Sequence, residues 1–223
     1  MKLLGAGMLA AVCVAVVAVP VDAASSAATW AMNEKTGSIM TDASGNANNG
    51  TLQNVRLGVA GFAGTGYGFN GRSARVVVPD SPSLNPGLSD LTITIHVAMT
   101  TLPADDYDLI RKGYATTTGG DYKIEIVNVG GVAEARCYFR GSTGSYQKTI
   151  PVPNLLDGLY HTIVCQKKAT SAVMTVDGHS YSRAATIGSI ANTAQLILGA
   201  KSASTTSNDW FAGSLDEVSI AIG

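Results

Sequence analysis

The feature that most constrains the fold is a period of two in the hydrophobic pattern, which recurs along the chain. "LTITIHVAM" (residues 91–99) is the clearest example, because its apolar side chains alternate with mostly polar ones. A strand with one buried face has this alternation, whereas an amphipathic helix repeats every 3.6 residues. Helical periodicity is nearly absent from the rest of the chain, so the sequence predicts an all-β protein.

Other strand-like segments are separated at short intervals by turn residues. In "SAVMTVDGHSYS", Asp177 and Gly178 supply the positive φ angles that a two-residue hairpin turn needs. The expected strands are 29–32, 67–70, 75–78, 91–99, 108–112, 122–127, 133–139, 161–167, 172–176, 195–198 and 215–220. Many short antiparallel strands without a βαβ rhythm predict a two-sheet β-sandwich or jelly roll.

The first 23 residues have the pattern of a secretory signal peptide. Lys2 precedes an apolar stretch from Leu3 to Val19, and small residues stand ahead of a cut after Ala23. A transmembrane anchor is the alternative, but the stretch is of marginal length and lacks basic flanking residues. We expect a secreted, extracellular protein in which residues 24–223 form a single domain.

Charge and cysteine content narrow the partners and the compartment. The formal net charge is -1, so we expect neither a nucleic-acid nor a membrane partner. Cys137 and Cys165 lie in apolar strand-like runs, and an even cysteine number in an oxidising compartment favours a pair. Two buried free thiols are the alternative to the disulfide that we predict.

Several segments between residues 30 and 220 carry a resemblance to a known family. They are "WAMNEKTGSIMTDASGNANNGTL", "GYGFNG", "VVVPDSPSLNP", "LTITIHV", "GLYHTIVCQK", "MTVDG" and "FAGSLDEVSI". In this order they resemble the laminin-G-like, concanavalin-A-like jelly rolls of secreted bacterial proteins. The chain departs from the family at "LYH", where a Trp usually precedes the His. The resemblance implies two packed antiparallel sheets, adjacent terminal strands, and Cys137 and Cys165 on neighbouring strands.

The loop "TDASGNANNGTL" (residues 41–52) offers hard oxygen donors of the kind that Ca²⁺ takes. If the chain ends meet, as the resemblance implies, the last strand could complete a calcium site. The candidate ligands are Asp42, Asn46, Asn48 and Asp216, with Glu217 or Glu34 as additions. The alternative is a plain turn, because Asp, Asn and Gly readily satisfy their own backbone.

Catalytic chemistry finds little support in the sequence. Glycoside hydrolases need two carboxylates about 5 to 9 Å apart, and the Glu-x-Asp-x-x-Glu pattern of hydrolases with this fold is absent. Strand alternation predicts Asp216 and Glu217 on opposite faces, and Asp121 and Glu125 as solvated residues on an exposed face. The three histidines are not expected to cluster. We therefore predict no catalytic residue.

Sugar binding would use exposed aromatic rings beside planar polar groups. Trp30 and Trp210 lie beside the terminal strands and are expected to pack in the core, whereas Tyr107, Tyr114 and Tyr146 adjoin polar loops. These three tyrosines are the candidate carbohydrate-binding residues. The sequence thus favours a secreted, non-catalytic, lectin-like module for a glycan or glycoprotein. The alternatives are a glycoside hydrolase or polysaccharide lyase of the same fold, and a structural or protein-adhesion domain without a glycan site.

Overall fold

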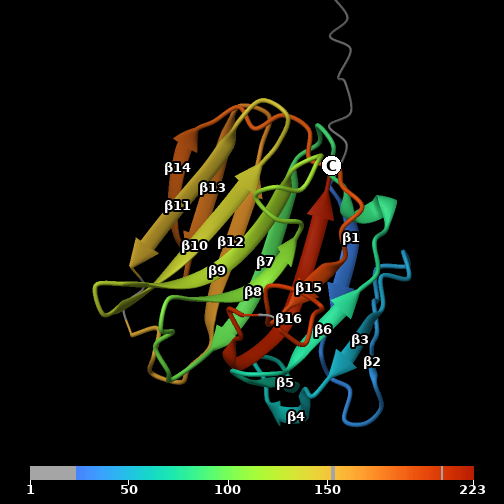
Figure 1. Ribbon diagram of the computed structural model, residues 1–223, viewed down its shortest axis with the longest axis vertical. Helices are drawn as coiled ribbons and strands as arrows, with labels where there is room; N and C mark the ends of the chain where they lie inside the picture. The colour runs from blue at the N-terminus through green and yellow to red at the C-terminus, as the bar shows by residue number, and fades with distance from the viewer. Residues whose placement is uncertain (1–23, 152–153, 207) are drawn as a thin grey trace, which may run out of the picture.

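The computed structural model describes residues 24–151, 154–206 and 208–223, and these residues form two antiparallel sheets packed face to face (Figure 1). The predicted all-β jelly-roll sandwich is confirmed. A single turn of 3₁₀ helix, η1 (Pro82–Leu84), is the helical element among the described residues. None of these residues forms a helix long and apolar enough to cross a membrane. The expected signal peptide, residues 1–23, lies outside the described residues.

The two sheets draw their strands from all parts of the chain. Sheet A has the order β14-β13-β12-β7-β16-β5-β4, with β1 paired to β16 outside this path. Its strands are β1 (Ser25–Trp30), β4 (Arg56–Ala60), β5 (Thr65–Asn70), β7 (Leu91–Ala98), β12 (His161–Lys167), β13 (Ser171–Val176), β14 (His179–Ala184) and β16 (Ala212–Ile222). Sheet B has the order β11-β10-β9-β8-β15-β6-β3-β2. Its strands are β2 (Ile39–Met40), β3 (Gly50–Gln53), β6 (Arg75–Val78), β8 (Asp106–Lys112), β9 (Asp121–Val129), β10 (Val132–Arg140), β11 (Ser145–Pro151) and β15 (Leu196–Leu198).

The first and last described strands lie side by side, as the family resemblance implied. Ser25 pairs with Ile222 and Trp30 with Val218, and Figure 1 shows β1 beside β16. Trp30 is fully buried, and its indole N–H donates to the Asn48 carbonyl oxygen at 2.8 Å. The prediction that Trp30 packs in the core is therefore confirmed.

The core lies between the sheets and is built by strand alternation. Every second residue of β7 points inward, and all four of these side chains are fully buried. They are Leu91, Ile93, Ile95 and Val97. Trp210 differs from Trp30, because it is half-buried and packs on a small apolar cluster formed by Val77, Ile197 and Ala200.

The disulfide between Cys137 and Cys165 is formed, with the two Cα atoms 5.7 Å apart. Cys137 lies on β10 of sheet B and Cys165 on β12 of sheet A, so the bond crosses the core and joins the two sheets. The two strands are neighbours across the sandwich and not within one sheet. Both cysteines are fully buried.

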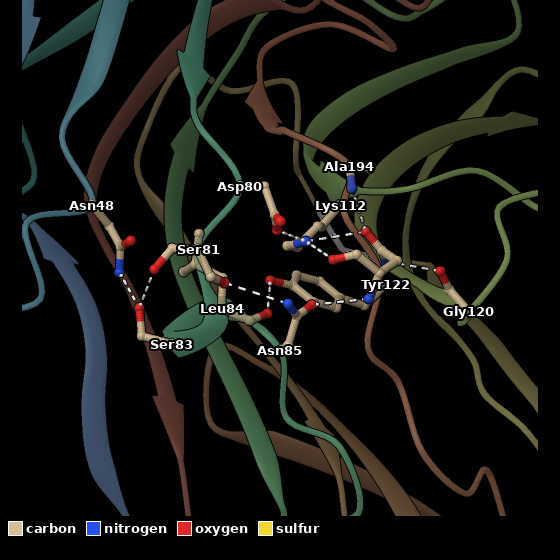
Figure 2. A network of polar contacts seen from close by, with 11 residues as sticks. Asn48, Asp80, Ser81, Ser83, Leu84, Asn85, Lys112, Gly120, Tyr122 and Ala194 are labelled. Carbon is tan, nitrogen blue, oxygen red and sulfur yellow. Dashed lines mark hydrogen bonds and ion pairs between the residues drawn. The ribbon is translucent and has the colours of Figure 1, made fainter.

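A largely buried polar network links sheet B to η1 (Figure 2). The Lys112 ammonium donates to Asp80 Oδ1 at 2.7 Å and to the Asn192 carbonyl oxygen at 2.7 Å. The Tyr122 hydroxyl donates to the Leu84 carbonyl oxygen at 3.0 Å. Burial lowers the pKa of Lys112, and the Asp80 carboxylate opposes this effect. These contacts join β8 and β9 to η1 and to the segment before β15.

Candidate functional site

Two adjoining hollows lie on the outer face of sheet A, where β4, β5, β16 and β7 run side by side. Their volumes are about 740 Å³ and about 350 Å³. We call them together the groove. Its defining residues are Arg56, Gly68, Ala98, Leu159, Tyr160 and Gly213. No Asp or Glu is among the residues that line either hollow.

Small residues on three neighbouring strands form the floor of the groove. Ser214 of β16 pairs with Gly68 of β5 on one side and with Ala98 of β7 on the other. A Cβ atom at Gly68 would approach Val59 Cγ1 to 3.2 Å, so any side chain there would crowd the groove. Glycine within a strand often marks a place where a ligand can approach the backbone closely.

The walls of the groove combine an aromatic ring, an aliphatic side chain and a cation. The Tyr160 hydroxyl donates to the Ala60 carbonyl oxygen at 3.0 Å, which fixes the ring. Burial, followed by the charge of Asp216, raises the pKa of Tyr160 to about 12, so the hydroxyl stays protonated at neutral pH. Leu159 is 67% exposed at the rim. Arg56 is exposed, and its guanidinium forms no ion pair with a described residue.

A β-bulge in β16 produces a further hollow on the same face. Asp216 pairs with His96 and Ser219 with Thr94. Between these two pairs β16 therefore contains one residue more than β7. Glu217 has a φ of 45° at the bulge and lines a hollow of about 570 Å³. The prediction that Asp216 and Glu217 point to opposite faces is therefore wrong. The extra residue brings both to the outer side of the sheet.

Two of the three predicted carbohydrate-binding tyrosines are buried, which corrects the prediction. Tyr107 is 9% exposed with its ring 5.7 Å from that of Phe211, and Tyr146 is 3% exposed with its ring 6.3 Å from that of Phe139. Both belong to strands, where alternation points them into the core. Their ring faces are therefore not available to a sugar.

Tyr114 remains a candidate, because it is 40% exposed. The Arg111 guanidinium carbon lies 5.1 Å from the centre of its ring. Tyr114 and Arg111 border a hollow of about 210 Å³ together with Gln195 and Lys201. This hollow lies over β8 and β15, which belong to sheet B, so it is separate from the groove.

The candidate calcium ligands of the first loop are engaged in hydrogen bonds with the protein. Asp42 accepts backbone N–H groups from Thr29, Ser44 and Asn48, each at 2.9 Å. Burial acts to raise the pKa of Asp42, but these hydrogen bonds outweigh it and hold the pKa below its ordinary value. The amides of Asn46 and Asn48 donate to the Ala27 carbonyl oxygen.

Asp216 is bonded to a different loop, because its Oδ2 accepts the Ala63 N–H at 2.9 Å. Glu34 accepts the Thr41 N–H at 2.8 Å and the Tyr67 hydroxyl. Among the described residues, no group of three or more His, Cys, Asp or Glu side chains is arranged to hold a metal ion. Calcium binding by Asp42, Asn46, Asn48 and Asp216 stays a prediction.

The two carboxylates weighed as catalytic candidates are paired and buried, not solvated as predicted. Asp121 accepts a hydrogen bond from Arg140 at 2.7 Å, and Glu125 accepts hydrogen bonds from Arg136 at 3.0 Å and from Lys123. Both carboxylates are 1% exposed. The cations come from β10 and from β9 itself, and they cover the carboxylates on the outer face of sheet B.

The three histidines lie in separate surroundings. His161 Nδ1 contacts Asp177 Oδ2 at 2.7 Å, His179 is exposed on β14, and His96 stacks on Phe62. Neither a catalytic triad nor a zinc site is assembled from them within the described residues.

The chain is thus a two-sheet jelly roll with a groove on the outer face of sheet A. Residues 70–221 match the model of the concanavalin A-like lectin/glucanases superfamily, and the chain belongs to that family. No curated protein matches the chain at a significant level.

Solved structures share the fold at low sequence identity. The binding domain of Paraclostridial Mosquitocidal Protein 1 superposes with a TM-score of 0.68 at 15% identity, covering 88% of this chain and 48% of that chain. Domain 4 of the extracellular arabinanase AbnA from Geobacillus stearothermophilus gives a TM-score of 0.59 at 16% identity, covering 90% and 93%. Mouse laminin alpha1 domains LG4-5 give 0.53 at 21% identity, covering 70% and 40%. The chain spans about half the length of the toxin binding domain.

Proposed function

We propose that this chain is a secreted, non-catalytic glycan-binding module that holds a saccharide in the groove. The observation that carries the proposal is the groove itself, with a floor free of large side chains and walls made by Tyr160, Leu159 and Arg56. Ligand sites are typically hollows with apolar and aromatic walls and a few placed polar groups. Secretion is supported by the disulfide, because such bonds persist mainly in oxidising compartments.

Each wall has a definite role in this proposal. The apolar C–H face of a sugar packs against the Tyr160 ring and the exposed Leu159 side chain, while the planar Arg56 guanidinium donates to hydroxyl oxygens. Because the Tyr160 hydroxyl is bonded to Ala60, the ring is ordered before the ligand arrives. A preordered wall lowers the entropy loss on binding.

Fold relatives support the glycan class. The binding domain of botulinum neurotoxin DC is described in complex with SialylT, and the arabinanase domain in complex with arabinotriose. These ligands belong to those proteins. This chain covers 93% of the arabinanase domain but only 48% of the neurotoxin binding domain. The arabinotriose complex therefore carries the comparison, and it favours a saccharide ligand over a purely structural role here.

A non-catalytic role is favoured by the positions of the carboxylates. Hydrolysis by this fold would need a carboxylate pair flanking the sugar, and the residues that line the groove include none. Asp121 and Glu125 on sheet B are neutralised by cations. A glycoside hydrolase or lyase would instead release reducing or unsaturated ends from a polysaccharide panel, and such turnover would overturn the proposal.

A glycan array, run with and without calcium, tests the function. We expect binding that falls roughly tenfold in Arg56→Ala and Leu159→Ala, because each removes one wall of the groove. Arg72→Ala is the matched control, since Arg72 is an exposed arginine outside the groove. Binding that depends on Tyr114 and not on Arg56 would move the site to sheet B. An array without any bound glycan would favour the structural or adhesion alternative.

A further inference from the structure

The hollow beside the β16 bulge has a chemical character of its own. We call it the Glu217 pocket, and its defining residues are Thr29, Phe62, Thr94, His96, Glu217 and Ser219. Its volume is about 570 Å³. The Phe62 ring lies edge-on to Tyr160 with the ring centres 6.2 Å apart, so this aromatic pair separates the Glu217 pocket from the groove.

The bulge is what gives the pocket its carboxylate. Leu215 and Val218 on either side are fully buried, and regular alternation would turn Glu217 toward the core. Glu217 instead adopts a φ of 45°, a conformation that L-residues other than Asn, Asp and Gly rarely take. Its carboxylate has no hydrogen bond or ion pair with any described residue. Backbone strain thus holds a carboxylate without a hydrogen-bonded partner in the lining of the pocket.

The aromatic wall opposite is held in place by a buried acid. Phe62 is 52% exposed and stacks on the His96 ring with centres 3.8 Å apart. Asp216 fixes the turn that carries Phe62, because its Oδ2 accepts the Ala63 N–H at 2.9 Å. Asp216 is fully buried, and its Oδ1 has no hydrogen-bond partner among the described residues. A large apolar ring therefore stays exposed next to the free carboxylate.

These groups select the charge of a ligand. The pocket lining contains Glu217, the Phe62 ring and the hydroxyls of Thr29, Thr94 and Ser219, but neither Lys nor Arg. Its one titratable nitrogen group is His96, whose Nδ1 lies 3.3 Å from the Glu217 carbonyl oxygen and whose ring is stacked under Phe62. An anion would be repelled, and a neutral sugar would leave the carboxylate without a cation. A protonated amine satisfies the carboxylate by a charge-assisted hydrogen bond and the Phe62 ring by a cation–π contact.

We propose that the Glu217 pocket binds the ammonium group of an amino sugar. This inference rests on the proposed function in one respect, namely that the ammonium group is carried by a saccharide. The pocket adjoins the groove through the Phe62–Tyr160 pair, so one sugar chain can place a unit in each. The substrate class is then a glycan with free amino groups, and N-acetylation removes the charge that the pocket recognises.

Three monosaccharides that differ at one position test the pocket. Glucosamine, N-acetylglucosamine and glucose are titrated into the ¹⁵N-labelled, disulfide-bonded protein below the pKa of the glucosamine amine. We expect glucosamine to shift the backbone signals of Thr94, His96 and Ser219 in a saturable way, with at least roughly tenfold weaker responses to the other two sugars. Glu217→Gln should reduce the glucosamine affinity by a similar factor.

Glu134→Gln is the matched control, because Glu134 lies on β10 of the other sheet. It should leave the glucosamine response unchanged. Equal responses to glucosamine and glucose, or an unchanged response in Glu217→Gln, would overturn the inference.

The two proposals fail in different ways. A glucosamine response at the Glu217 pocket without any glycan-array binding would support the ammonium site and refute the groove as a glycan site. Array binding that requires Arg56, combined with no glucosamine response, would keep the glycan-binding function and refute the ammonium site.

Discussion

Two lysines form ion pairs of the same length in different surroundings, and this permits a controlled test of the buried network (Figure 2). Lys112 lies 2.7 Å from Asp80, with the lysine side chain 0% and the aspartate side chain 31% exposed. Lys201 lies 2.7 Å from Asp209, with the lysine side chain 40% and the aspartate side chain 13% exposed. The two lysines thus differ in burial. The perturbation is the substitution of each lysine by Met, which keeps the length of the side chain and removes the charge.

The expected losses differ because the pairs differ in burial. Lys112→Met leaves the Asn192 carbonyl oxygen without its donor and Asp80 without its cation. The Asp80 carboxylate is 31% exposed and can be hydrated, so the main loss is the donor to the buried Asn192 carbonyl oxygen. A buried acceptor without its donor costs about 1 to 3 kcal/mol, and a domain of this size loses about 2 to 4 °C in Tm per kcal/mol. We therefore expect Tm to fall by about 2 to 12 °C. Lys201→Met should cost less than about 1 kcal/mol, because the exposed Lys201 ammonium is screened by water.

Urea unfolding, followed by circular dichroism with the disulfide intact, measures both changes. The free energy of unfolding of each variant is compared with that of the unmodified chain at one pH and ionic strength. Losses that are equal within the error of the measurement would refute the argument that burial of the lysine decides its contribution. A stabilised Lys112→Met variant would show that desolvation of the ammonium outweighs its hydrogen bonds.

Three further predictions concern the disulfide, pH and calcium. Replacing Cys137 and Cys165 by Ala should lower the free energy of unfolding by about 3 to 4 kcal/mol, because the bond closes a loop with a sequence separation of 28; unreduced mass spectrometry verifies the bond first. Burial, followed by the charge of Asp209, raises the pKa of Asp106 to about 7, so the folded state prefers the protonated acid; the free energy of unfolding should fall between pH 4 and 7, and Asp106→Asn should flatten this slope. Millimolar calcium should raise Tm relative to a chelator if Asp42 ligates the ion, and Asp42→Ala should abolish that response; an unchanged Tm leaves Asp42 as a loop-forming residue alone.

The strands that the sequence predicts well are those with one buried face. β7 alternates along its whole length and was expected within one residue of its bounds. β11 was missed, because it is an edge strand in which only Tyr146 and Ile150 are buried. The sequence of a strand with so few apolar residues resembles that of a loop. For this reason the sequence predicts an exposed Tyr146. Tyr107 was placed outside β8 by a single residue, which was enough to reverse its predicted exposure.

Buried charges escaped prediction for another reason. Asp121 pairs with Arg140 and Glu125 with Arg136 across the β9–β10 ladder. Pattern reasoning correctly gives these residues an outward-facing position, but it does not show which cation lies on the neighbouring strand. Cross-strand partners are set by register, and register depends on turn length and on the whole buried face.

The bulge at Glu217 is where local pattern and long-range pairing disagree. The sequence "LDEV" alternates apolar and acidic residues imperfectly, and a regular strand would bury one of its two acids. Burying an unpaired carboxylate costs far more than a strained φ angle, which costs on the order of 1 to 3 kcal/mol. Inserting one extra residue against β7 turns Leu215 and Val218 to the core and leaves Asp216 and Glu217 on the outer side of the sheet. There Asp216 is covered by the turn that carries Phe62, but it accepts the Ala63 N–H and so holds this turn. Glu217 is left facing an aromatic ring, which is why the ammonium site depends on this bulge and could not be read from the spacing of the acids.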